Sequence, residues 1–124
     1  MESGTGAIVK RWDEVQLDQM RQGITRRFVH SDQLMVAQIG FPAGAVVPAH
    51  RHHNEQVTYM VSGVLRFLFG DDQDQEVILR AGDVVFIPGG LLHSAVALED
   101  TFELDIFSPP REDWIDGSDA YLRQ

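Results

Sequence analysis

The sequence contains no cysteine, and this absence removes several kinds of site at once. Disulfide bonds, zinc ribbons, iron–sulfur clusters and thiol nucleophiles all require thiol groups. Basic residues are also scarce: 10 Lys and Arg stand against 19 Asp and Glu, which gives a net charge of −9 at pH 7. Because such a surface repels phosphate groups, we expect neither a nucleic acid nor an anionic membrane as a partner.

Long hydrophobic runs are missing as well. No segment approaches the roughly 20 apolar residues that a membrane-spanning helix needs, and the first residues, 1–12, hold no apolar stretch of signal-peptide length. We therefore expect a cytoplasmic protein. The 124 residues contain no internal repeat or low-complexity tract, and this length is typical of one domain.

Short runs of β-branched and aromatic residues recur from about Gly23 onward, separated by Gly, Pro, Asp and Ser. They predict strands at Ile24–His30, Leu34–Phe41, Gln56–Val61, Val64–Phe69, Glu76–Leu79, Val84–Ile87, Ser94–Leu98 and Phe102–Phe107. Strands this short and this evenly spaced predict an all-β sandwich or barrel. Outside them, Trp12–Met20 fits either a short helix or an edge strand, and Ser118–Leu122 fits a capped helical turn.

One of the predicted strands carries acidic residues on an otherwise apolar face. Since side chains alternate along a strand, Glu103, Asp105 and Phe107 share one face of Phe102–Phe107. An unpaired carboxylate is costly to remove from water, so such a group must be paired, hydrated or protonated. We interpret this face as the wall of a polar cavity.

Histidines form the most distinctive cluster. His50 and His52 point the same way on an extended strand, Gln56 opens the next predicted strand, and His93 begins a distant one. Ligands from several strands would close a mononuclear metal site inside a barrel. The alternative, which the spacing alone leaves open, is a solvated loop cluster without a metal.

Two spaced motifs indicate a family. The first consists of Gly44, His50, His52, Gln56 and Gly63, and the second of Gly82, Pro88, Gly90, His93 and Ala97. In spacing, both resemble the motifs of cupins, which are small β-barrels (double-stranded β-helix or jelly roll). The resemblance implies a single cupin domain over 1–124, with a barrel core at about 24–108, an N-terminal arm at 1–23 and a C-terminal tail at 109–124.

The resemblance also implies one divalent transition metal, bound by His50, His52, Gln56 and His93. Two positions depart from the usual pattern: Gln56 stands where cupins usually have Glu, and Ala97 where they usually have Asn. The neighbouring Glu55 lies one residue early and faces away. A shell without a charged ligand favours Lewis-acid chemistry on an anion over dioxygen activation. Nitrogen and amide oxygen ligands suit zinc, nickel, iron, cobalt or manganese, so the identity of the metal stays open.

A narrower resemblance concerns the segments His50–Tyr59 and Leu104–Trp114. Both are similar to the KdgF-type cupins of pectin degradation, which linearise unsaturated uronate monomers from pectin and alginate. This implies an isomerase-like enzyme with a small anionic sugar as its substrate. It also implies that Asp105, Phe107 and Arg111 are catalytic or contact the substrate. Ring opening of such a substrate needs a group that moves protons and a cation for the carboxylate. We assign the first to Asp105 as general acid/base and the second to Arg111, whose guanidinium can form two hydrogen bonds with a carboxylate.

Each of these roles has an alternative. Asp105 would then only support a neighbouring group, Phe107 would belong to the core, and Arg111 would pair with Glu112 or Asp113. Other functions fit the same shell: a polyketide cyclase, an isomerase of antibiotic biosynthesis, a dioxygenase, or a sugar-binding cupin without catalysis. Because cupin barrels commonly pair through their outer strands, we also expect a homodimer.

Overall fold

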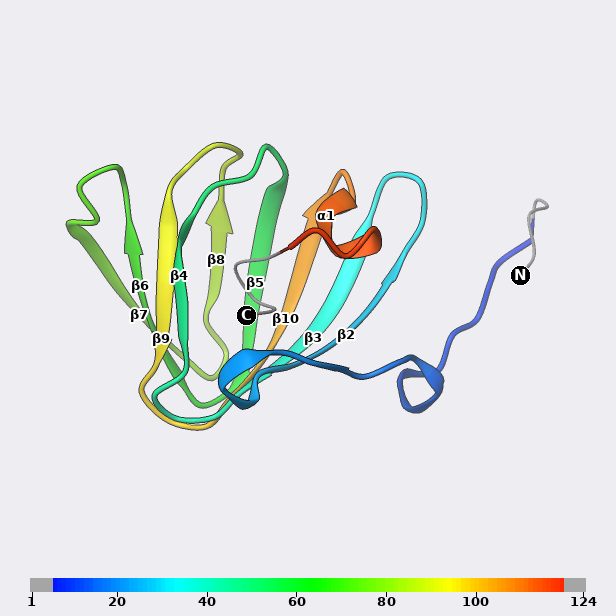
Figure 1. Cartoon of the computed structure of the whole chain (residues 1–124), viewed down its shortest axis with the longest axis horizontal. Helices are drawn as coiled ribbons and strands as arrows, with labels where there is room; N and C mark the ends of the chain where they lie inside the picture. The colour runs from blue at the N-terminus through cyan, green and yellow to red at the C-terminus, as the bar shows by residue number, and fades with distance from the viewer. Residues whose placement is uncertain (1–5, 120–124) are drawn as a thin grey trace.

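The structure is a computed structural model that describes residues 6–119. It contains two antiparallel sheets that face each other (Figure 1). This confirms the predicted all-β barrel. The larger sheet has the order β1-β2-β3-β10-β5-β8 and the smaller one the order β4-β9-β6-β7. The strands are β1 (Asp18–Gln19), β2 (Thr25–His30), β3 (Met35–Phe41), β4 (Val46–His50), β5 (Glu55–Ser62), β6 (Val64–Phe69), β7 (Gln75–Arg80), β8 (Val84–Ile87), β9 (His93–Ala97) and β10 (Thr101–Ser108).

Strict alternation of side chains determines what each sheet buries. Along β3, Met35, Ala37, Ile39 and Phe41 are buried and their neighbours are partly exposed. The inward side chains of β6 meet them from the opposite sheet, and together they form the apolar core between the two sheets. The strand β10 pairs with β3 on one side and β5 on the other. Its inward face therefore lies in the middle of the larger sheet, where water has little access.

The predicted strand positions agree with the observed ones, but the sequence pattern predicts no strand at the position of β4. The strand β4 contains Pro48 and is only five residues long, so its pattern is weak. The segment Trp12–Met20, for which the sequence left a short helix or an edge strand open, contains a 3₁₀ turn at Trp12–Glu14 and the whole of the two-residue edge strand β1. The arm that leads to this turn extends away from the barrel (Figure 1).

The C-terminal tail differs from the expected helical turn. One short helix, α1 (Glu112–Ile115), follows β10 and lies over the barrel beside β10 and β3 (Figure 1). Ser118 and Asp119 are not helical, and the rest of the expected turn, 120–122, lies outside the described residues. Within residues 6–119, no helix is both long and apolar enough to cross a membrane.

Candidate functional site

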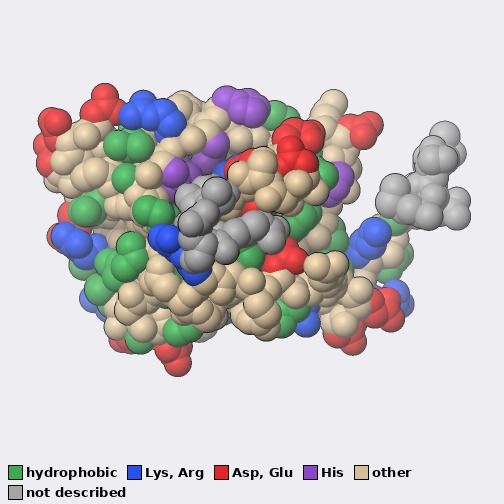
Figure 2. All heavy atoms as spheres, viewed as in Figure 1, with side chains coloured by type: hydrophobic (Ala, Val, Ile, Leu, Met, Phe, Trp, Pro, Cys, Tyr) green, Lys and Arg blue, Asp and Glu red, His purple; other side chains and the backbone are tan. Residues whose placement is uncertain are grey.

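The three motif histidines converge at one end of the barrel. His50 ends β4, His93 begins β9, and the two residues are paired in register. His52 follows in the loop before β5. One ring nitrogen from each histidine lies within 4.8 Å of the others. Figure 2 shows histidine side chains gathered on this face, over the part of the barrel where β4 and β5 lie. This spacing allows one ion to contact all three rings.

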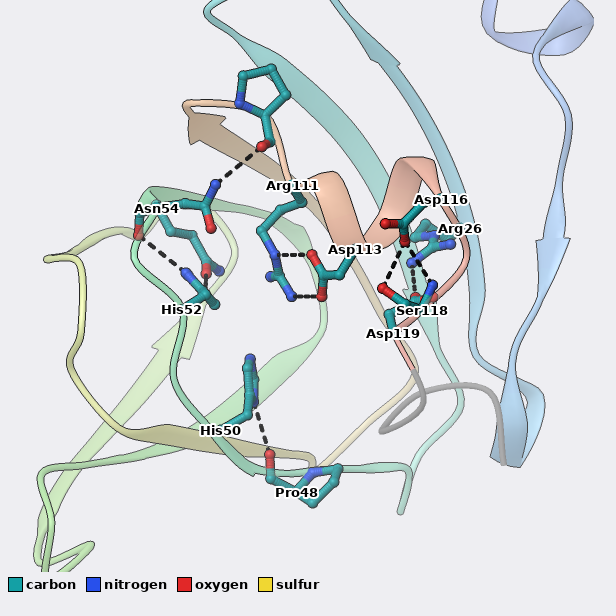
Figure 3. A network of polar contacts seen from close by, with 12 residues as sticks. Arg26, Pro48, His50, His52, Asn54, Arg111, Asp113, Asp116, Ser118 and Asp119 are labelled. Carbon is teal, nitrogen blue, oxygen red and sulfur yellow. Dashed lines mark hydrogen bonds and ion pairs between the residues drawn. The ribbon is translucent and has the colours of Figure 1, made fainter.

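A main-chain carbonyl oxygen holds each of these rings. The Nδ1 atoms lie 2.9 Å from Pro48 O for His50, 3.1 Å from Asn54 O for His52 and 2.8 Å from Leu91 O for His93. Figure 3 shows the first two contacts. Because a carbonyl oxygen only accepts, each neutral ring carries its hydrogen on Nδ1, and Nε2 carries the lone pair. Main-chain fixation of the tautomer is the arrangement that metal-binding histidines use.

The electrostatic surroundings keep these rings neutral. Burial, with a contribution from the charge of His93, lowers the pKa of His50 to about 3. Burial, followed by the nearby charges of Arg111 and His93, lowers the pKa of His52 to about 4. Burial lowers the pKa of His93 as well. At neutral pH the site therefore presents three uncharged imidazoles, which is the protonation state that binds metals.

A hydrogen-bond chain orients Gln56, which is almost fully buried. Its Nε2 donates to Thr58 Oγ1 at 2.9 Å, and the Thr58 hydroxyl donates to Asp105 Oδ1 at 2.6 Å. Since the hydroxyl has one hydrogen and gives it to Asp105, it must accept from the amide. The amide nitrogen of Gln56 is thereby directed away from the histidines and its carbonyl oxygen toward them.

This orientation supplies a test of whether a cation fits the site. Gln56 Oε1 lies 3.1 Å from His52 Nε2. With the hydrogen of His52 on Nδ1, both of these atoms carry lone pairs and repel each other unless a positive charge lies beside them. A proton on His52 is disfavoured at neutral pH, because its pKa is about 4. A metal ion satisfies both atoms, so His50, His52, Gln56 and His93 fit a divalent metal.

The loop that carries His52 is fixed by the turn after β8. A Cβ atom on Gly89 would lie 2.3 Å from His53 O, so only glycine fits there. Gly90 has φ +84 and its N–H donates to His52 O at 2.8 Å. Asn54, also buried, donates from Nδ2 to Pro109 O at 2.6 Å. The two contacts connect the histidine loop to the segments before β9 and after β10.

Asp105 lies inside the barrel, where it lines the same cavity as His50, Gln56 and His93. Burial raises the pKa of Asp105, while hydrogen bonds from Glu103 and Thr58 and the charge of Arg111 oppose that rise. A buried carboxyl with a raised pKa can both accept a proton and return it. The polar wall on the inward face of β10 is therefore present.

Phe107 and Arg111 form the outer part of this cavity wall. The ring of Phe107 is 1% exposed and lies edge-on to His52, with centroids 5.7 Å apart. The guanidinium of Arg111 lies 5.2 Å from the centre of the Phe107 ring and 4.9 Å from that of Trp114. Its Nε and Nη2 donate to the two carboxylate oxygens of Asp113 at 2.9 and 2.7 Å (Figure 3). The pairing of Arg111 with Asp113, which the sequence left open as an alternative, is therefore present. The same buried side chain also lines the cavity.

A second buried arginine holds the segment after α1 against the barrel. Arg26 donates to Asp119 at 2.6 Å and to Asp18 at 3.1 Å, and its guanidinium lies 4.5 Å from the centre of the Trp114 ring. No pattern in the sequence singles out Arg26, Asn54 or Thr58. Their importance depends on cross-strand register, which one sequence does not reveal.

Comparison with known proteins fits this geometry. The cupin domain family matches residues 38–108, more than half of the chain. The chain belongs to the cupin family. This cupin is 29% identical over 106 residues to the pectin degradation protein KdgF of Dickeya dadantii, which covers 83% of this chain and 94% of that protein.

Two solved structures resemble this cupin over most of their length. KdgF from Halomonas sp. is 33% identical, with a TM-score of 0.74 and coverage of 82% of this chain and 94% of the other. An RmlC-like cupin from Shewanella frigidimarina is 30% identical, with a TM-score of 0.76 and coverage of 88% and 96%. The resemblance to KdgF drawn from the motifs is therefore confirmed at the level of the fold and of most of the chain.

Proposed function

We propose that this cupin is a metal-dependent isomerase that opens the ring of 4,5-unsaturated uronate monosaccharides and yields linear keto-uronates. One observation carries the proposal: Asp105, a buried carboxyl group, is connected through Thr58 to Gln56, which lies beside three histidines that could hold a metal ion, and none of these four candidate ligands is an acid. The similarity to two KdgF proteins, one of them named a pectin degradation protein, supports the same substrate class.

The reaction requires little more than a proton transfer. In the cyclic substrate the C4=C5 double bond is conjugated to the carboxylate, and C5 carries the ring oxygen. Removing the proton from the hydroxyl on C1 forms the aldehyde and breaks the bond between C1 and the ring oxygen, which leaves an enolate at C5. Adding one proton to C4 then gives the ketone. The net change is one proton moved from O1 to C4, with no redox partner.

Asp105 has the properties of the group that moves this proton. Its carboxylate accepts hydrogen bonds and carries a pKa raised by burial, so it can take the proton from O1 and return it to C4. When bound, the metal supplies Lewis-acid stabilisation of the substrate carboxylate and of the developing enolate charge. The rings of Phe107 and Trp114 keep water from this part of the cavity.

Arg111 contributes positive charge to the same space. Asp113 already holds its Nε and Nη2 edge, so a substrate carboxylate would either displace Asp113 or bind beside the pair. Arg111 therefore attracts the anionic substrate, and Asp113 sets the orientation of the guanidinium. The sequence instead suggests that Arg111 forms two hydrogen bonds with the substrate carboxylate.

The test uses the conjugated ultraviolet absorbance of the unsaturated monomer, which disappears on ring opening. We expect the metal-loaded protein to accelerate this loss, and Asp105→Asn to lower kcat by about 10²- to 10⁴-fold, the usual share of a general acid/base. Asp71→Asn is the matched control, because Asp71 is exposed and pairs with Arg51 at the surface.

Three results would decide against the proposal or refine it. No acceleration by the wild-type protein at full metal occupancy would refute it. Tight binding of the uronate without turnover would favour a sugar-binding cupin. A variant Asp105→Asn that retains its metal and its full activity would remove Asp105 from the chemistry.

A further inference from the structure

Glu103 is a second buried carboxyl group in the barrel, and the reaction proposed above does not use it. It lies on β10 two residues before Asp105, on the same inward face, and is 3% exposed. It also lines the same cavity as the candidate metal ligands. Its partners in register are Ile39 on β3 and Met60 on β5, both buried and apolar. Neither neighbour supplies a positive charge or a hydrogen-bond donor.

The polar contacts of Glu103 are few. Its side chain forms a hydrogen bond with the carboxyl of Asp105. Its Oε1 atom is buried without a hydrogen-bond partner, and no Lys or Arg among residues 6–119 forms an ion pair with it. Arg26 on β2 is in register with Ile39 on β3, which lies between Arg26 and Glu103, and the guanidinium of Arg26 is bound to Asp18 and Asp119. An ionised Glu103 would therefore be an uncompensated buried charge, which is strongly unfavourable.

A hydrogen bond between two carboxyl groups requires a proton on one of them. Asp105 accepts a second hydrogen bond from the Thr58 hydroxyl, and the positive charge of Arg111 acts on it. Both favour the ionised form of Asp105, and neither acts on Glu103. Burial, together with the negative charge of Asp105, raises the pKa of Glu103 well above its usual range. The two carboxyls thus have different environments, and the proton belongs on Glu103.

We propose that Glu103 is a permanently neutral carboxylic acid whose hydroxyl donates to Asp105 and positions that carboxylate for its work. This rests on the proposed function in so far as Asp105 acts on a uronate. Asp105 lies between two donors, Thr58 and Glu103, in the hydrogen-bond chain Gln56–Thr58–Asp105–Glu103. Rotation of the Asp105 carboxylate would break one of these contacts, so its remaining lone pairs keep a fixed direction. Glu103 is a positioning residue and does not itself exchange its proton with substrate.

Infrared spectroscopy tests the protonation state without any substrate. At neutral pH we expect the carbonyl stretch of a buried, protonated carboxylic acid in the wild-type protein, shifted by exchange into D2O. The band should be absent from Glu103→Gln and retained in Asp105→Asn. Absence of the band from the wild-type protein, or its loss in Asp105→Asn with retention in Glu103→Gln, would overturn the assignment.

Kinetics test the positioning role. Glu103→Gln keeps a donor toward Asp105, so we expect it to retain most of the turnover, whereas Glu103→Met keeps the size without the donor and should lose at least tenfold in kcat. Met60→Leu, a similar-sized change beside Glu103, is the control and should behave like the wild type. Equal losses in Glu103→Gln and Glu103→Met would refute positioning through a hydrogen bond. If the wild-type protein does not turn over uronates, the proposed function fails while the infrared result still decides the state of Glu103.

Discussion

Replacing Thr58 with Val removes one hydroxyl group and keeps nearly the same shape. The hydroxyl is fully buried, accepts from Gln56 at 2.9 Å and donates to Asp105 at 2.6 Å. Without it, two buried polar groups lose a partner. Such a loss amounts to about 1–3 kcal/mol for each group, so we expect the free energy of unfolding to fall by about 2–6 kcal/mol.

The more informative effect concerns metal binding. In Thr58→Val the amide of Gln56 loses the contact that directs its carbonyl oxygen toward His52. Loss of such a supporting contact typically weakens metal affinity by about 10- to 100-fold, which corresponds to about 1.4–2.7 kcal/mol. Titration of the metal-free protein with Zn²⁺ or Co²⁺ in a calorimeter measures this change directly.

Thr101, the first residue of β10, offers a matched control away from the histidines. Thr101 is also buried, and its hydroxyl oxygen accepts from Val64 N–H at 3.1 Å and lies 2.9 Å from Glu99 O, to which it donates. We expect Thr101→Val to lower the free energy of unfolding without changing metal affinity. Unchanged metal affinity in Thr58→Val, in a protein that remains folded, would refute the role assigned to the chain from Gln56 to Asp105.

Three further outcomes follow from the structure. His93→Ala should lose stoichiometric metal by elemental analysis while Asp71→Asn retains it, and chelation of the wild-type protein should abolish turnover until metal is restored. In the metal-free protein the pKa is about 3 for His50 and about 4 for His52, whereas an unfolded histidine binds its proton near pH 6.5. The free energy of unfolding should therefore fall as the pH drops below about 6.5 and level off near pH 3. Denaturant titrations measure this dependence, and its slope should be smaller for His50→Gln. Phe86 on the edge strand β8 is 74% exposed, so we expect a homodimer by light scattering that Phe86→Glu converts to a monomer, and a monomeric wild type would contradict this.

The sequence predicted the strands of the barrel because their pattern is local. Alternation along β10 was enough to place Glu103, Asp105 and Phe107 on one inward face. The spacing of the motifs was enough to select the histidines that the structure brings within 4.8 Å. Properties of this kind depend on neighbours in the chain, or on a pattern shared with a family.

The contacts that organise the site depend on register between distant strands. Thr58 faces Asp105 only because β5 and β10 pair in one register, whereas the pairing of Arg111 with Asp113 is local and the sequence already offers it as an alternative. The structure also gives a reason for Gln56 in place of the usual Glu. A carboxylate at this position has no hydrogen to donate to Thr58. The single hydroxyl hydrogen of Thr58 would then have two anionic acceptors, the carboxylate at position 56 and Asp105.

The partners that orient the three imidazoles are main-chain oxygens of Pro48, Asn54 and Leu91. No replacement of a neighbouring side chain can delete a main-chain oxygen, so the orientation of the three imidazoles does not depend on which side chains line the rest of the barrel. Wall positions such as Ile39 and Phe67 are therefore the places to diversify when a new reactant is sought. The three-histidine cluster would tolerate such libraries, and changes in selectivity would not require a change in the way these rings are held.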